Sequence, residues 1–162
     1  NIFERKVTNF SNFKKKYIVL NFDEKWIHKE YIKHYIDIEP SKNELLDFFN
    51  KIIKKTDLEL VITTGTGENL IINEIINTDF NNRVKIYKEL NFFQLEEIIS
   101  KSIVLISCHG SVSHIASGNN IKQIDIIDKS YDYSKWTKHF RNYNYINRDK
   151  FSILSQKILL KL

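Results

Sequence analysis

Short apolar runs rich in isoleucine, valine and leucine alternate along the chain with longer segments whose apolar residues recur every three or four positions. The short runs are typical of buried strands, and the longer segments of helices with one apolar face. This alternation predicts βαβ units, in which right-handed crossovers place helices on both faces of a parallel sheet. The expected fold class is therefore α/β, with a Rossmann-like, doubly wound parallel sheet. The five expected strands are residues 17–22, 58–63, 84–87, 103–107 and 121–127.

Helix signals are clearest after the first and the third of these strands. Ser41 is a predicted N-cap, and Glu44, three residues later, completes a capping-box pattern. Asn91 is a second predicted N-cap, for a helix that runs to about residue 100. The residues expected on the buried face of that helix are Phe92, Leu95, Ile98 and Ile99. Further expected helical segments are residues 68–76, a loop leading into a helix at 110–117, and residues 150–160.

The chain divides into a short N-terminal stretch and one domain. Residues 1–16 are polar and basic, which favours a connector or an N-terminal arm. Residues 17–162 are numerous enough to bury one core. Within them, residues 128–149 are polar, aromatic and irregular, so we expect a surface excursion before the last helix. Because the sequence does not begin with methionine, we expect it to be a piece of a longer protein.

The loop that follows the fourth strand carries the strongest candidate site. Ligands of open parallel sheets bind beyond the carboxyl ends of the strands. At that position Gly110 allows close approach of the backbone, Ser111 and Ser113 supply hydroxyl groups, and the next helix directs free N–H groups at a ligand. Such a helix start favours a diphosphate, to which His109 and His114 would donate hydrogen bonds. The competing interpretation is that a serine merely caps the helix.

Two earlier loops carry weaker signals. Gly65, Thr66 and Gly67 form a turn followed by Glu68, but this segment is neither a dinucleotide-binding fingerprint nor a P-loop. A tight turn with Thr66 capping the next helix explains the residues as well as ligand contact does, and both interpretations stay open. Lys25, after the first strand, is suited to pairing with a phosphate, or is an ordinary surface lysine.

Charge and cysteine content narrow the classes of partner. The formal net charge of +5 suits an anionic partner such as a nucleotide diphosphate, a nucleic acid or an acidic membrane surface. No recognition motif for nucleic acid is present, so that partner is disfavoured. The single cysteine, Cys108, excludes an internal disulfide, fits a cytoplasmic setting and is expected to serve in packing rather than as a nucleophile. No metal site is expected, because His109 and His114 lack acidic or cysteine companions at ligand spacing.

Residues 103–127, IVLISCHGSVSHIASGNNIKQIDII, resemble the donor loop of family 9 glycosyltransferases, the heptosyltransferase-like group. That family carries an Asp-Ser/Thr-Gly-Pro-x-His segment at this point. Laid on it, His109 takes the place of the Asp, and His114 keeps the closing His. The pair of His109 and Gly110, together with Ser113, is also similar to a His-x-Gly-x-x-Ser segment of other GT-B glycosyltransferases, which contacts the donor diphosphate.

Two earlier segments agree with the family in order and spacing. Lys25 and Trp26 are similar to the region whose lysine reaches the donor phosphates. Residues 65–68 are similar to the turn whose glutamate, here Glu68, contacts the donor ribose. Together the three segments cover about residues 17–127.

The resemblance implies that the chain is the donor-binding half of a two-domain GT-B glycosyltransferase. Such an enzyme transfers a sugar from a nucleotide sugar to a cell-surface glycan or lipopolysaccharide-type acceptor, often lipid-linked, with no metal and no cofactor. The catalytic base is expected in an N-terminal acceptor domain outside this sequence. Residues 128–162 are expected to reach that domain, with Trp136, Tyr143 and Tyr145 as packing anchors.

The single cysteine fits a cytoplasmic location, and the lipid-linked acceptors of such enzymes together with the positive charge permit peripheral contact with the inner face of a membrane. The alternative from a different class is a non-catalytic nucleotide- or phosphate-binding α/β module.

Overall fold

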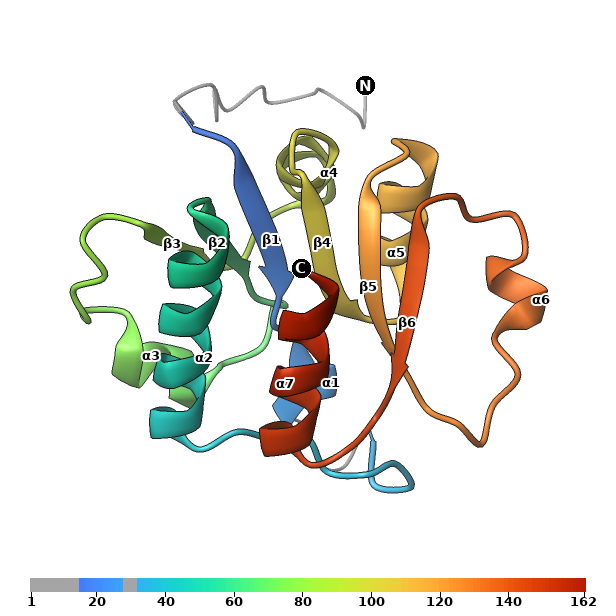
Figure 1. Cartoon of the computed structure of the whole chain (residues 1–162), viewed down its shortest axis with the longest axis horizontal. Helices are drawn as coiled ribbons and strands as arrows, with labels where there is room; N and C mark the ends of the chain where they lie inside the picture. Colours follow the sequence, from blue (N-terminus) through green and yellow to red (C-terminus); the bar gives the residue numbers. More distant parts are fainter. Residues whose placement is uncertain (1–14, 28–31) are drawn as a thin grey trace.

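A six-stranded, fully parallel sheet forms the centre of the molecule, in a computed structural model that describes residues 15–27 and 32–162 (Figure 1). The strand order is β3-β2-β1-β4-β5-β6. The order reverses between β1 and β4, which is the switch point of a doubly wound sheet. The fold class predicted from the sequence is confirmed. The strands are β1 (Tyr17–Asn21), β2 (Glu59–Thr63), β3 (Val84–Tyr87), β4 (Val104–Cys108), β5 (Lys122–Ile127) and β6 (Tyr143–Asn147).

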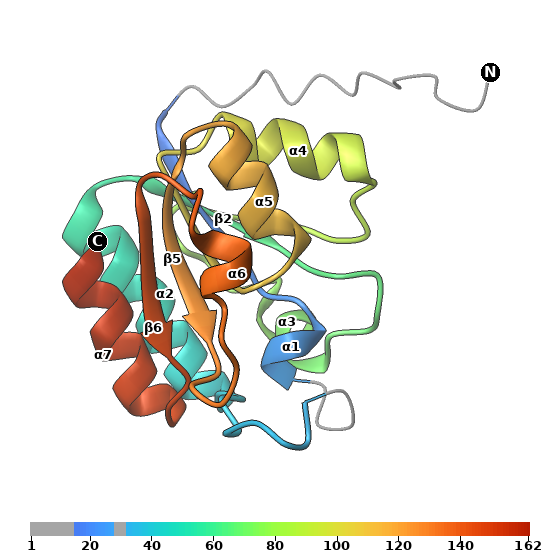
Figure 2. The same ribbon diagram turned by 90° about the vertical axis from the view of Figure 1, so that its right-hand side faces the viewer.

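Helices cover both faces of this sheet (Figures 1 and 2). One face is packed by α2 and α7, and the opposite face by α4 and α5. The shorter helices α1 and α3 lie at the carboxyl edge, and α6 lies in the connection between β5 and β6. The helices are α1 (Glu24–Ile27), α2 (Lys42–Thr56), α3 (Leu70–Ile75), α4 (Phe92–Ser100), α5 (Ser111–Gly118), α6 (Ser134–Thr137) and α7 (Phe151–Lys161).

The core consists of two layers because successive residues of a strand point to opposite faces. In β1, Ile18 and Leu20 pack in the layer that includes α2 and α7, whereas Tyr17 and Val19 pack in the layer of α4 and α5. All four side chains are at most 2% exposed. A strand buried on both faces reads as a continuous apolar run, which is why the sequence predicted this strand so clearly.

Local capping fixes the ends of the predicted helices. Ser41 Oγ accepts a hydrogen bond from the backbone N–H of Glu44, whose carboxylate accepts one from the backbone N–H of Ser41, so the predicted capping box is confirmed. Asn91 caps α4 as predicted. The expected burial of Phe92 is wrong, since its side chain is 58% exposed. Only Ile98 and Ile99 of α4 are buried, so the first turn of this helix extends beyond the packed layer.

The expectation that residues 128–149 are irregular is wrong for their last third. Residues 143–147 form β6, which pairs in parallel with β5 from Gln123–Tyr143 to Ile127–Asn147. Only Ile146 of this edge strand is buried, so its sequence lacks a run of apolar residues. The following helix, α7, packs against α2, and Lys55 Nζ donates to the carbonyl of Leu159 at 2.6 Å. The last helix thus completes this domain's own core, and contact with a further domain stays a prediction.

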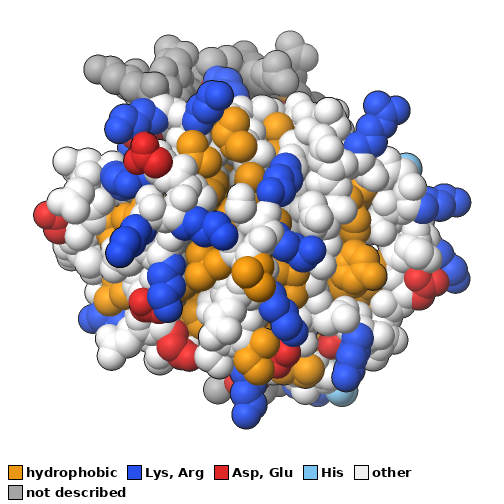
Figure 3. All heavy atoms as spheres, in the orientation of Figure 1, with side chains coloured by type: hydrophobic (Ala, Val, Ile, Leu, Met, Phe, Trp, Pro, Cys, Tyr) orange, Lys and Arg blue, Asp and Glu red, His pale blue; other side chains and the backbone are white. Residues whose placement is uncertain are grey.

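Residues 1–14 lie outside the described part of the chain, so the connector expected at 1–16 is not tested. None of the described helices is long and apolar enough to cross a bilayer. On the face shown in Figure 3, lysine and arginine side chains are spread among apolar and neutral groups. They are not gathered into one stripe there, in agreement with the sequence pattern.

Candidate functional site

The carboxyl ends of β1 and β4, at the switch point, bring together two loops that are far apart in the sequence. Lys25 lies in α1, just after β1, and Gly110 joins β4 to α5. A Cβ atom at Gly110 would lie 2.7 Å from Lys25 Nζ. The backbone of Gly110 is extended, with a φ of 173°, so other residues can adopt its conformation. Glycine matters here because it leaves room for the ammonium group at the start of α5.

The ammonium group of Lys25 is held in place by a chain of hydrogen bonds. Its Nζ atom lies 3.0 Å from Asp23 Oδ2, and Asp23 also accepts from Asn21 Nδ2 at 3.0 Å. Asn21 in turn accepts from Thr63 Oγ1 on β2 at 2.9 Å. Burial by itself lowers the pKa of Lys25, but the Asp23 carboxylate outweighs it and raises that pKa. Lys25 is therefore a fixed, charged group that is 20% exposed.

Burial also raises the pKa of Asp23, and the neighbouring Lys25 offsets only part of this effect. The two shifts have a common origin, because Asp23 is the more deeply buried partner. The ion pair is best understood as an anchor that fixes the direction of Lys25.

The N-terminus of α5 faces the same space. Among the described residues, no acceptor receives a hydrogen bond from the backbone N–H of Ser111 or Val112. The two free donors and the helix dipole favour a negative charge at this point. Ser111 is exposed beside them, and its contact with a ligand stays a prediction.

Ser113 lies behind this loop. It is fully buried, its Oγ accepts from the backbone N–H of Gly110 at 3.2 Å, and it donates to Asp125 Oδ1 at 2.8 Å. Its hydroxyl group therefore supports the conformation of the loop from inside. Direct contact between Ser113 and a ligand stays a prediction that this geometry does not favour.

Asp125 on β5, which sequence reasoning missed, organises the interior of the site. Its buried carboxylate accepts from the hydroxyl groups of Ser107, Ser113 and Tyr143, and His109 Nδ1 lies 2.6 Å from Asp125 Oδ2. Burial, and next the charge of Asp125, raise the pKa of Tyr143. The alternation of polar and apolar residues in β5 is the signal that could have identified this residue, because polar side chains are unusual inside a central parallel strand.

His109 and His114 both lie in an aromatic cluster beside α5 and α6. The ring centroid of His109 is 4.9 Å from that of Tyr133 and 5.9 Å from that of His114. His114 is exposed, and its ring lies 6.3 Å from that of His139. Burial, followed by the charges of His109 and His139, lowers the pKa of His114. His109 is therefore fixed by Asp125, whereas His114 lies on the outer side of the loop.

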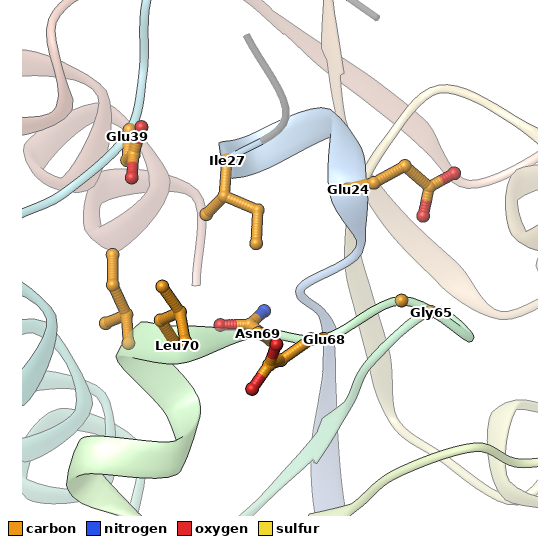
Figure 4. A pocket seen from close by; sticks show the side chains of 9 residues that line it. Glu24, Ile27, Glu39, Gly65, Glu68, Asn69 and Leu70 are labelled. Atoms are coloured by element: carbon orange, nitrogen blue, oxygen red, sulfur yellow. The ribbon is translucent and has the colours of Figure 1, made fainter. Parts of the chain in front are cut away.

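The predicted residues of the earlier turn line a separate hollow of about 420 Å³ between α1 and α3 (Figure 4). Gly65 and Glu68 are among its lining residues, and Thr66 is exposed next to them. The side chain that caps α3 is that of Asn69, so the alternative of a cap by Thr66 is wrong. The carboxylates in this lining are those of Glu24, Glu39 and Glu68.

Three carboxylates make this hollow unfavourable for phosphate, but they suit hydroxyl and amino groups as hydrogen-bond donors. Figure 4 shows Ile27 opposite Leu70, with Glu68 and Asn69 alongside, so the hollow combines an apolar wall with acceptors. Such a lining suits a ligand that presents hydroxyl or amino groups together with an apolar ring face.

Cys108 is 1% exposed, and burial raises the pKa of its thiol group. The prediction that it serves in packing is confirmed. Within residues 15–27 and 32–162, no group of three or more His, Cys, Asp or Glu side chains is arranged to hold a metal ion.

No protein-family description and no curated relative matches the chain. Among solved structures it is similar to the Escherichia coli ADP-heptose LPS heptosyltransferase II, with a TM-score of 0.65 and 13% identity over 92% of this chain and 46% of that one. It is also similar to the UDP-GlcNAc 2-epimerase of Methanocaldococcus jannaschii, with a TM-score of 0.57 and 11% identity over 91% and 38% of the two chains.

A third similar structure is the wall teichoic acid polymerase TagF, with a TM-score of 0.50 and 18% identity over 90% of this chain and 34% of that one. The chain thus spans less than half the length of each of these proteins. At such identities the likeness concerns the fold alone: the chain has the Rossmann-like fold of one half of a GT-B architecture.

Proposed function

We propose that the chain is the donor-binding half of a GT-B glycosyltransferase that transfers a sugar from a nucleotide sugar to a cell-surface glycan or lipopolysaccharide-type acceptor. The observation that carries this proposal is that Lys25 Nζ lies beside Gly110, at the N-terminus of α5 where backbone N–H groups have no acceptor among the described residues. A fixed ammonium group and two free backbone N–H groups face one small space. That combination is suited to a diphosphate.

The same arrangement suits the chemistry of sugar transfer. As the bond between the sugar and the diphosphate breaks, negative charge grows on the leaving nucleotide diphosphate. In this proposal Lys25, which Asp23 holds in place, and the free N–H groups of Ser111 and Val112 would stabilise that charge with little reorganisation. In this proposal no metal ion is required, and the base that activates the acceptor belongs to a further domain.

The names of the similar structures support a nucleotide sugar as the ligand. The heptosyltransferase is named for ADP-heptose, and the epimerase for UDP-GlcNAc. In this chain the hollow that contains Gly65 and Glu68 would take the nucleoside, and Glu68 would accept hydrogen bonds from ribose hydroxyl groups. Because the fold is shared by a transferase and an epimerase, transfer must be tested by its product.

Titration calorimetry with UDP, ADP, GDP and CMP tests the diphosphate site. We expect one nucleotide to bind, and Lys25→Met to weaken that binding about tenfold or more, because a charge-assisted contact is lost. Lys54→Met is the matched control, since Lys54 is exposed on α2 away from the carboxyl edge. Equal affinities for the wild type and Lys25→Met would contradict the proposal, provided that thermal melting shows both variants folded.

The competing function is a nucleotide-binding module without catalysis. Incubating the full-length protein with a nucleotide sugar and a glycan acceptor separates the two functions. A glycosylated product supports transfer, whereas nucleotide binding without a glycosylated product from any nucleotide sugar supports the module. Contact with an acidic membrane surface is a further part of the proposal, checked by sedimentation with anionic vesicles.

A further inference from the structure

Arg148 is a buried cation that the proposed diphosphate site does not use. It follows β6 at the carboxyl edge and is 6% exposed. Its Nε donates to the carbonyl of Ile36 at 3.1 Å, and one terminal nitrogen donates to the carbonyl of Lys25 at 3.0 Å. The other terminal nitrogen lies 3.7 Å from the sulfur of Cys108. Among the described residues no carboxylate forms an ion pair with this guanidinium group.

A buried charge without a counter-charge is costly, because burial removes it from water. A guanidinium group has five N–H donors, and backbone carbonyls of Ile36 and Lys25 together with the Cys108 sulfur occupy three. Two N–H donors of the Arg148 guanidinium group remain, and Arg148 lines a hollow of about 90 Å³. Lys25 and His109 belong to the same lining. This volume holds about three water molecules, which is also room for a carboxylate or phosphoryl group.

Asp128 contributes the one carboxylate among the described lining residues of this hollow. Its Oδ1 atom already accepts from the backbone N–H and the hydroxyl group of Ser130. Lys25 is already paired with Asp23 at 3.0 Å, so Arg148 is the cation of this lining that forms no ion pair among the described residues. An anion bound in the hollow would supply the counter-charge that this guanidinium group lacks.

A second hollow, of about 260 Å³, opens beside the first and shares Tyr35, His109 and Tyr133 with it. Its other lining residues are Tyr131 and Trp136, which are 51% and 52% exposed. Exposed aromatic rings around an open cup suit the C–H face of a sugar ring. The anion hollow and the aromatic cup are thus contiguous.

We infer that these two hollows form a subsite for a sugar that bears an anionic group, with Arg148 binding the carboxylate or phosphoryl group and the aromatic cup holding the ring. The inference rests on the proposed function in taking the ligand to be a sugar. It adds that the transferred sugar is acidic. Arg148 also fixes the carbonyl of Lys25, so the two anion sites are physically connected.

Three probes that share the glucose ring test the subsite, namely glucose, glucuronate and glucose 6-phosphate. Each is titrated into the ¹⁵N-labelled chain, and binding is followed by NMR. The Nε–Hε signal of Arg148 is assigned by its loss in Arg148→Lys. We expect at least one anionic sugar to shift this signal and the Trp136 indole signal, with a dissociation constant about tenfold below that of glucose. Preference for glucuronate identifies a carboxylate, and preference for glucose 6-phosphate a phosphate.

Two variants complete the test. Arg148→Met should remove the preference for the anionic sugar. Trp136→Ala, at an exposed position, should lower the affinity for all three sugars by the same factor. Equal affinities for glucose and both anionic sugars in the wild type would overturn the inference, even if Arg148→Met does not fold. An unmoved Arg148 signal would overturn it as well.

The nucleotide titration is separate from this one. If the chain binds a nucleotide but shows no preference for anionic sugars, the acidic-sugar subsite is rejected and the proposed diphosphate site stands. If sugars bind at Arg148 but no nucleotide binds, the proposed diphosphate site is rejected and the acidic-sugar subsite stands.

Discussion

At the scale of single residues, the site depends on small distances between groups that the chain brings from different loops. Lys25 is charged, anchored by Asp23 and directed to the one place where Gly110 leaves space. Sequence reasoning selected Lys25, His109, Gly110 and Ser111 as candidates because polar residues at strand ends are conspicuous, and their contact with a ligand stays a prediction. The same reasoning missed Asp23, Asp125 and Arg148, whose roles depend on partners that only the fold brings close.

Replacing Gly110 with alanine tests the space over the helix start. The new Cβ would lie 2.7 Å from Lys25 Nζ, so the flexible end of the lysine must move away. We expect nucleotide affinity to fall several-fold with little change in the free energy of unfolding, because the extended backbone tolerates alanine. Calorimetry and urea unfolding measure the two quantities.

Gly118→Ala is the matched control on the same helix, since a Cβ there meets nothing within 4 Å. If Gly110→Ala bound nucleotide as well as Gly118→Ala does, the space at Gly110 would have no part in binding.

At the scale of elements, periodicity and capping predicted most of the helices and five of the six strands. The missing strand, β6, lies at the sheet edge with one buried residue, so its pattern resembles a loop. The predicted burial of Phe92 is wrong for a different reason. Periodicity shows which face of a helix is apolar but not how far along the helix the packed layer extends. Loop conformation at the ends of β4 and β5 depends on the Asp125 network, which no local pattern encodes.

The environment of His114 on α5 predicts that the free energy of unfolding depends on pH. Burial, together with His109 and His139, lowers the pKa of His114 in the folded state below its ordinary value of 6.5. The unfolded chain therefore binds a proton at a higher pH than the folded chain. Stability attributable to His114 is present above pH 6.5 and is lost as the pH falls through the folded-state pKa.

Melting temperatures between pH 8 and pH 5, about the range in which histidine titrates, test this sign. We expect His114→Gln to reduce the decline in acid, and His34→Gln, at an exposed position, to leave it unchanged. A steeper decline in His114→Gln would show that the folded state favours the charged form.

At the scale of the whole molecule, the last helix closes the fold, because α7 packs on the α2 face of the sheet. Leu154 is fully buried there. Leu154→Ala should therefore lower the free energy of unfolding by about 2–5 kcal/mol, the usual cost of such a cavity. Urea unfolding measures this loss, and Ser152→Ala, at an exposed position on the same helix, is the control. A cost near zero for Leu154→Ala would mean that α7 does not belong to this core.

The central claim is that an anion binds where Lys25, Gly110 and the start of α5 meet. A crystal structure of the chain with the nucleoside diphosphate that binds most tightly tests it most directly. The account predicts phosphate oxygens within hydrogen-bonding distance of Lys25 Nζ and of the backbone N–H groups of Ser111 and Val112. Density for the diphosphate at any other place, with that space left to solvent, would contradict it.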